Sequence, residues 1–172
     1  LRDYNVILLM LDTGIRTSEL MAITNDDYDP ESQSIQIRSA VAKTSRSRTL
    51  YLSNMTNASL RKFLKVKPDA WEQWLFPTRD GKQLKANVLG RNFRKYCQRS
   101  GVKFTPYQIR HSFATFYLEN GGDLFTLQRQ MGHTDLQMTR RYTEISDKLL
   151  VECHQNYSPI ALLQSSTRKN KV

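Results

Sequence analysis

The chain has 172 residues, of which 39% are apolar and 24% are charged. That length fits one domain of roughly 100–200 residues, which can bury a core without disulfides or metals. The composition excludes a disordered or fibrous protein. Lysine and arginine number 26 against 16 aspartate and glutamate, so the formal charge of +10 suggests an anionic partner such as nucleic acid.

Neither a membrane span nor a disulfide framework is indicated. The longest apolar run, residues 6–11, has six residues, far fewer than the roughly 20 that a spanning helix needs. Cys97 and Cys153 are too few for a disulfide framework, so we expect both thiols to be reduced and buried. Because position 1 is Leu rather than Met, we expect that an N-terminal part of a parent protein precedes this chain.

The first elements are two helices and a hairpin. Apolar spacing predicts a helix over residues 3–12, which Gly14 can end in the left-handed conformation. A second helix is expected over residues 17–23, capped by the Thr17 hydroxyl. Alternating polar and apolar residues predict strands at 34–38 and 48–52, which we expect to form an antiparallel hairpin with a basic tip.

Helical patterns dominate the rest of the chain. Thr105, Pro106 and Gln108 form a helix-start signal, because threonine can cap, proline fits the first helical position and glutamine can close a capping box. The fold class is therefore mainly α with a small antiparallel β-sheet. The predicted helices span residues 56–65, 85–100, 106–119, 123–131, 135–145 and 147–156.

Two arginines are candidates for binding a phosphate. Arg16 precedes the second predicted helix, and Arg110 shares a helix face with Tyr107 near the positive end of its helix. An arginine fork can hold two phosphate oxygens at once, so two such residues could form a clamp. The alternative is that Arg16 only pairs with Glu19 and that Arg110 is solvated.

A third segment joins a histidine to a tyrosine. Gly132 and His133 separate two predicted helices, and Tyr142 lies nine residues after His133. A tyrosine hydroxyl titrates near pH 10, so as a nucleophile it needs a base and positive charge nearby. Arg140 and Arg141 supply local charge. Alternatively, His133 is a structural residue of the helix junction and Tyr142 is half-buried packing.

Together these segments resemble the catalytic domain of the tyrosine recombinases, also called the phage integrase family. Residues 13–20, TGIRTSEL, are similar to the family's T-G-x-R-x-x-E-L box. Residues 107–115, YQIRHSFAT, are similar to its H-x-L-R-H-x-x-A-T box. Residues 131–133, MGH, with Tyr142 nine residues on, resemble the L-G-H and nucleophile segment. The likeness covers about residues 1–150, and it implies the fold of that catalytic domain.

The resemblance also implies roles for individual residues. In the family a hairpin lysine precedes an Arg-x-hydrophobic-x-Leu strand by five residues, as Lys43 precedes residues 48–52 in this chain. The implied catalytic roles are phosphate binding by Arg16 and Arg110, a phosphate hydrogen bond from His133, protonation of the 5′ leaving oxygen by Lys43, and attack on phosphorus by Tyr142 to leave a 3′-phosphotyrosine. The residues expected to contact DNA are Arg16, Lys43, Arg46, Arg110, Arg140 and Arg141.

Tyr107 departs from the family pattern, since it stands where the first histidine of the second box is usual. A phenol can donate or accept a hydrogen bond but is a poor base at neutral pH. We therefore expect Tyr107 to orient the phosphate or the nucleophile, and the base for Tyr142 stays open. Two alternatives remain: a DNA-binding module of the same fold with impaired cleavage, and a relaxing enzyme like a type IB topoisomerase.

The resemblance further implies partners and organisation. We expect residues 1–156 to form the catalytic domain, residues 157–172 to be a tail that can be exchanged between subunits, and N-terminal DNA-binding domains of the parent to be missing. The partner is double-stranded DNA at a specific site, bound as a homotetramer, with a monomer or weak oligomer in its absence. No cofactor, metal or membrane is expected. The implied source is a bacterium or phage, in the cytoplasm at the nucleoid.

Overall fold

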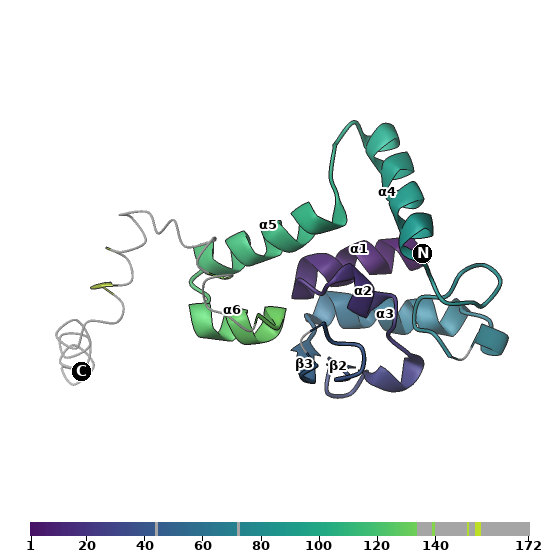
Figure 1. Ribbon diagram of the computed structural model, residues 1–172, viewed down its shortest axis with the longest axis horizontal. Helices are drawn as coiled ribbons and strands as arrows, with labels where there is room; N and C mark the ends of the chain where they lie inside the picture. Colours follow the sequence, from purple (N-terminus) through teal and green to yellow (C-terminus); the bar gives the residue numbers. More distant parts are fainter. Residues whose placement is uncertain (44, 72, 134–138, 140–150, 152–153, 156–172) are drawn as a thin grey trace, which may run out of the picture.

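The structure is a computed structural model (Figure 1). It describes residues 1–172 except 44, 72, 134–138, 140–150, 152–153 and 156–172. The described elements are helices α1 (Arg2–Thr13), α2 (Thr17–Leu20), α3 (Asn54–Val66), α4 (Ala86–Ser100), α5 (Pro106–Glu119) and α6 (Leu124–Met131), short 3-10 turns η1 (Asn25–Asp27) and η2 (Asp69–Trp71), and strands β1 (Tyr28–Asp29), β2 (Ser34–Ile37) and β3 (Arg48–Tyr51). Within this part of the chain, no helix is long and apolar enough to cross a membrane.

The sheet has three antiparallel strands in the order β1-β2-β3. The pairing of Ile35 with Leu50 sets the register of β2 and β3 and puts both side chains in the core. On the opposite face, Thr49 donates a 2.8 Å hydrogen bond to the exposed Gln36. The predicted hairpin is confirmed. β1 was not predicted, because its two residues lie in a cluster of turn-forming side chains.

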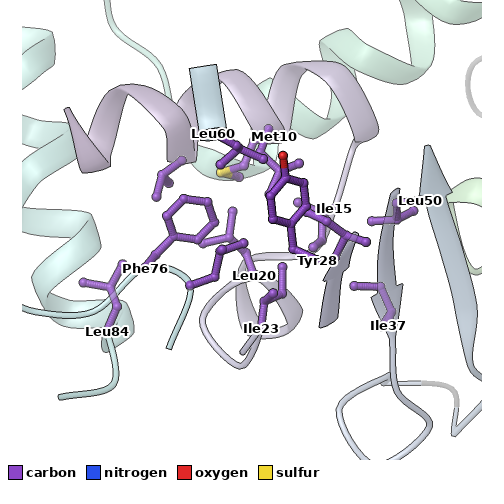
Figure 2. Close-up of a cluster of buried hydrophobic side chains, with 14 of the residues drawn as sticks. Met10, Ile15, Leu20, Ile23, Tyr28, Ile37, Leu50, Leu60, Phe76 and Leu84 are labelled. Carbon is purple, nitrogen blue, oxygen red and sulfur yellow. The ribbon is translucent and has the colours of Figure 1, made fainter. Parts of the chain in front are cut away.

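One apolar core joins the sheet to α1, α2 and α3. Figure 2 shows Met10, Ile15, Leu20 and Leu60 around the ring of Tyr28, whose exposed fraction is small. The Tyr28 hydroxyl donates a 2.5 Å hydrogen bond to the side chain of Asn57 in α3. Burying these side chains accounts for the fixed position of the short α2, whose residues by themselves could not sustain a helix.

A second, smaller apolar cluster holds α5 to α6. Its buried members are Phe113, Ala114, Leu127 and Met131. In Figure 1, α5 extends along α1 and continues beyond the sheet, and α6 lies beside its far end, near β3. α6 is therefore placed by contacts with α5 and with the sheet, and the end of α6 is brought toward the α1–α2 turn.

Most of the predicted helices are confirmed. α5 has the predicted bounds, and the Thr105 hydroxyl accepts a hydrogen bond from the Gln108 N–H at 3.2 Å. The second helix is shorter than predicted, and its cap was assigned wrongly: α2 ends at Leu20 and its N-cap is Arg16, not Thr17. Cys97 is free and half-buried rather than buried, and Cys153 lies outside the described residues. The helices predicted at 135–145 and 147–156 also lie largely outside them.

Candidate active site

The turn between α1 and α2 positions Arg16. The Thr13 hydroxyl donates to a carbonyl in the preceding turn of α1 at 2.7 Å and accepts from the Ile15 N–H at 3.3 Å. Gly14 then adopts φ +61°, and a side chain there would start 2.3 Å from the ring of Phe113. The Thr-Gly pair therefore makes a tight reversal that only glycine fits, and it places Arg16 at the entrance of α2.

Three arginines from three different elements meet at the C-terminal end of α6. The last carbonyls of a helix lack partners within the helix and carry partial negative charge, so cations are stabilised there. Each arginine donates to a different one of these carbonyls: Arg48 Nε to Gln130 at 2.8 Å, Arg110 Nη2 to Met131 at 2.9 Å, and Arg16 Nη2 to Gly132 at 2.9 Å. Arg110 Nη1 also donates to the carbonyl of Gly14.

Glu19 supplies the negative charge beneath the arginines. Its carboxylate is fully buried and accepts from Arg16 at 3.2 Å and from Arg48 at 2.9 and 2.7 Å. Burial raises the pKa of Glu19, but the hydrogen bonds and charges of Arg48 and Arg16 outweigh it, so the pKa lies below its ordinary value. A buried carboxylate held by two guanidinium groups fixes both side chains in place.

Gly132 ends α6 and opens space for the arginines. It adopts φ +62°, and the next residue, His133, donates its backbone N–H to the Gln128 carbonyl at 3.0 Å, which is a Schellman termination. A side chain at Gly132 would start 2.9 Å from Arg48 Nη1 and 3.2 Å from Arg16 Nη1. Glycine is therefore required at this position both by the backbone and by the packed guanidinium groups.

His133 follows Gly132, and each of its two ring nitrogens has a side-chain partner. Its Nε2 lies 3.0 Å from Nη2 of Arg110, and its Nδ1 lies 2.9 Å from Oγ1 of Thr139. Burial and the positive charges of Arg110, Arg16 and Arg48 lower the pKa of His133 to about 4. The imidazole is therefore neutral at physiological pH in this arrangement.

A cavity of about 620 Å³ opens beside these groups, between the sheet and α6. Arg46, Arg48 and Arg129 contribute positive charge to its lining, and His133 contributes its ring. Among the described residues, no three His, Cys, Asp or Glu side chains group in a way that could hold a metal ion. The cavity therefore presents cationic and hydrogen-bonding groups, which suit an anion such as a phosphodiester.

The structure brings together Arg16, Arg110 and His133, three of the predicted site residues. The ion pair of Arg16 with Glu19, weighed as the simpler alternative, is also present. Arg110 is not merely solvated, because it donates to the carbonyls of Gly14 and Met131 and contacts His133. The ion pair therefore does not exclude the clamp, since Glu19 holds the Arg16 side chain beside Arg110; phosphate binding by the two arginines stays a prediction.

The other predicted site residues are exposed at the surface or lie outside the described residues. Lys43 and Arg46 are exposed on the connection between β2 and β3. Tyr107 is 70% exposed on the first turn of α5, where its ring stacks on His111 with centroids 6.4 Å apart. Tyr142, Arg140 and Arg141 lie outside the described residues. The roles assigned to all of these residues stay predictions.

Sequence reasoning did not assign a role to Arg48, Glu19 or Thr139 in the site. The spacing of Glu19, three residues after Arg16, was a usable signal, since such a pair shares a helix face. Arg48 gave a weaker signal, as a charged residue at the start of a strand whose neighbours alternate. Nothing local to Thr139 distinguishes it, because its partner is known only from the folded chain.

The arrangement can stabilise negative charge on a bound group. Three guanidinium groups against the Glu19 carboxylate leave a net formal charge of +2 among these four side chains. Their positions are fixed before any ligand enters, by the carbonyls of α6 and by Glu19. Donors held in this way need no rearrangement when charge develops on a reacting group, which is what makes such sites effective.

Comparison with solved structures identifies the fold. The described fold is similar to that of the XerA recombinase crystal structure, with a TM-score of 0.73 and 26% identity over 92% of this chain and 57% of that one. It is also similar to the Tn1549 transposon integrase in complex with a circular intermediate DNA, with a TM-score of 0.76 and 23% identity over 89% of this chain and 58% of that one. The mainly α fold with its small sheet is thus the fold of these catalytic domains.

The phage integrase family matches residues 1–148, and the chain belongs to that family. Tyrosine recombinase XerC of Chlamydia pneumoniae is 34% identical over 168 residues, which are 94% of this chain and 53% of the relative. Tyrosine recombinase XerA of Saccharolobus solfataricus is 33% identical over 144 residues, which are 84% of this chain and 46% of the relative. The chain thus spans about half the length of these curated relatives.

Proposed function

We propose that this chain is the catalytic domain of a site-specific DNA recombinase or integrase. The observation that carries the proposal is the meeting of Arg16, Arg110 and His133, from separate elements, at one helix end beside a cationic cavity. Family membership and relatives named tyrosine recombinases support it. The substrate is double-stranded DNA at a specific site.

The reaction we infer is a transesterification at phosphorus. The Tyr142 oxygen, once it has lost its proton, forms a bond to the scissile phosphorus, and the bond from phosphorus to the 5′ oxygen breaks. Lys43 gives a proton to that leaving oxygen, and the strand remains as a 3′-phosphotyrosine. Attack by the 5′ hydroxyl of another strand reverses these steps and rejoins the DNA without a nucleotide cofactor.

The arginines serve the transition state in this scheme. Charge builds on the nonbridging oxygens as phosphorus becomes five-coordinate, and fixed cationic donors stabilise it more than they stabilise the ground state. Arg16 and Arg110 are suited to this because the carbonyls of α6 and Gly14 already orient them. Arg46, exposed beside the cavity, together with Arg140 and Arg141, is assigned to contacts with the DNA backbone.

One observation favours the alternative of a DNA-binding module that no longer cleaves. Tyr107 stands where the second box of the family usually has a histidine. Its ring is largely exposed and stacks on His111. A phenol there is a poor base for Tyr142. The third alternative, a relaxing enzyme, shares the same covalent step and differs in lacking exchange between two sites.

The test is covalent capture on DNA. Duplexes that bind the protein are selected from a random-sequence library and rebuilt with a nick near the cleavage position, so that the cleaved end diffuses away. We expect a covalent adduct, mapped by mass spectrometry to Tyr142, that forms equally well in excess EDTA. Tyr142→Phe removes only the nucleophilic oxygen, so it should bind DNA normally and form no adduct.

Tyr4→Phe is the control, because Tyr4 is 57% exposed on α1 and is not among the residues that line the cationic cavity. It should form the adduct at the rate of the unaltered protein. DNA binding without any adduct would establish the non-cleaving alternative. An adduct with relaxation of supercoiled DNA, but no joining of two sites, would establish the relaxing enzyme.

A further inference from the structure

Thr139 contacts the His133 ring at the nitrogen that does not face Arg110. It is fully buried, and its Oγ1 lies 2.9 Å from Nδ1 of His133. The other ring nitrogen, Nε2, lies 3.0 Å from Nη2 of Arg110. Both nitrogens of this imidazole thus have a fixed partner, and the two partners differ in chemistry: one is a guanidinium and the other is a hydroxyl.

These two partners determine the tautomer. A guanidinium only donates, so Nε2 must accept the hydrogen bond from Arg110 and cannot carry a proton. In a neutral ring the proton is then on Nδ1, which donates it to the Thr139 hydroxyl. A doubly protonated ring is disfavoured, since Arg110, Arg16 and Arg48 surround it with positive charge and the carboxylate of Glu19 is already taken by Arg16 and Arg48.

The proposed function requires the opposite tautomer. To donate a hydrogen bond to a phosphate oxygen from Nε2, a neutral His133 must carry its proton there, and Nδ1 must then accept. A hydroxyl can turn and donate where it previously accepted, whereas a carbonyl or carboxylate can only accept. Thr139 therefore fits both tautomers of the ring.

We propose that Thr139 is a positioning residue that lets His133 exchange its Nδ1–H tautomer for the Nε2–H tautomer when a DNA phosphate enters the site. The inference rests on the proposed function, since it takes the phosphate as the new partner of Nε2. Nε2 gives up its hydrogen bond from Arg110 and takes a proton from solvent water, while Nδ1 releases its proton to water, so the ring carries one proton before and after. The Thr139 hydroxyl turns from acceptor to donor, and the ring keeps a hydrogen bond at Nδ1 in both states. His133 becomes a phosphate donor without becoming a cation.

The first test reads the tautomer directly. Nitrogen-15 chemical shifts of histidine-labelled protein distinguish Nδ1–H from Nε2–H, and His133→Gln identifies the His133 signals. We expect Nδ1–H in the DNA-free protein and Nε2–H after addition of a selected duplex. The DNA-bound spectra use Tyr142→Phe, so that no cleavage occurs. His133 already in the Nε2–H form without DNA, or unchanged with DNA bound, would overturn the proposal.

The second test separates the hydroxyl from the shape of residue 139. Thr139→Ser keeps the hydroxyl and should cleave nicked DNA at close to the normal rate. Thr139→Val keeps the shape but leaves Nδ1 without a partner, and we expect roughly a 10- to 100-fold slower cleavage, by analogy with the range found for hydrogen-bond partners of metal-ligating histidines. DNA affinity should stay unchanged in both. Equal rates for Thr139→Val and the unaltered protein contradict the proposal.

The two tests also separate this inference from the proposed function. If the unaltered protein binds DNA and shows the change of tautomer but forms no adduct, the catalytic proposal fails and the role of Thr139 stands. If an adduct forms on Tyr142 but His133 keeps one tautomer, the role of Thr139 fails and the catalytic proposal stands. Should Thr139→Val fold poorly, as shown by its urea midpoint, the spectra of the unaltered protein still decide.

Discussion

Arg48 on β3 and Glu19 on α2 form an ion pair with two hydrogen bonds, of 2.9 and 2.7 Å, between a fully buried carboxylate and a guanidinium whose side chain is only 7% exposed. The same guanidinium donates to the Gln130 carbonyl at the end of α6. One side chain therefore ties the sheet to α2 and to α6. The candidate site is assembled across these three elements, so its geometry depends on this contact.

Replacing Arg48 should lower the free energy of unfolding. Arg48→Ala leaves the buried Glu19 with only the 3.2 Å hydrogen bonds from the side chain and the backbone N–H of Arg16, and breaking such a pair costs about 3–5 kcal/mol of the free energy of unfolding. Urea unfolding measures this. Arg46→Ala, an exposed arginine of the same hairpin, is the control and should change the free energy by less than about 0.5 kcal/mol. Equal effects of the two changes would show that the ion pair does not stabilise the fold.

Gly132→Ala should cost more stability than a matched change at Gly101. Both glycines end a helix with positive φ, of 62° and 72°, so both substitutions incur the left-handed strain of about 1–2 kcal/mol. Only Gly132 faces guanidinium atoms within 3.2 Å, whereas Gly101 has nothing within 4 Å. The excess destabilisation of Gly132→Ala, and a loss of DNA affinity in that variant alone, should appear in urea unfolding and gel-shift titrations. Identical behaviour of the two variants would contradict the described packing.

Mild acid should destabilise the protein through His133. Its pKa falls from 6.5 to about 4 on folding, so between these values the unfolded chain binds a proton that the folded chain does not. The free energy of unfolding therefore decreases as the pH falls from about 6.5 to about 4. Urea unfolding at pH 7 and pH 5 measures the decrease, and it should be smaller in His133→Gln. If NMR shows the His133 ring titrating with its ordinary pKa of 6.5 in the folded protein, burial and the three arginines do not lower that pKa.

Deletion of residues 157–172 should weaken assembly on DNA. This segment carries Ile160, Leu162 and Leu163 after a break at Ser158 and Pro159, a pattern suited to docking on another subunit. We expect the truncated chain to bind a single site normally and to form fewer complexes with two-site DNA, as seen by gel shift. If it assembles and recombines like the full chain, residues 157–172 have no role in exchange between subunits.

Local patterns predicted much of the fold and part of the site. The bounds of α5 follow from a cap, a proline and apolar spacing, all of which act within a few residues. The end of α1 at Gly14 follows from the left-handed conformation that glycine allows. The extent of α2 could not be predicted in this way, because a four-residue helix is stabilised by the core contacts of Leu20 and not by its own hydrogen bonds.

The sequence by itself determined the mainly α class, the hairpin and the residue types of the candidate site, because helix ends, alternation and motif spacing are local properties of the chain. Only the tertiary structure decided that Arg16, Arg48 and Arg110 donate to the three successive carbonyls of residues 130–132, where α6 ends. It also decided that Glu19 neutralises part of their charge and that Thr139 contacts His133. These contacts join residues up to 116 positions apart. They form because a buried charge or a helix end must find a partner somewhere in the folded chain, and packing, not sequence spacing, determines which partner is within reach.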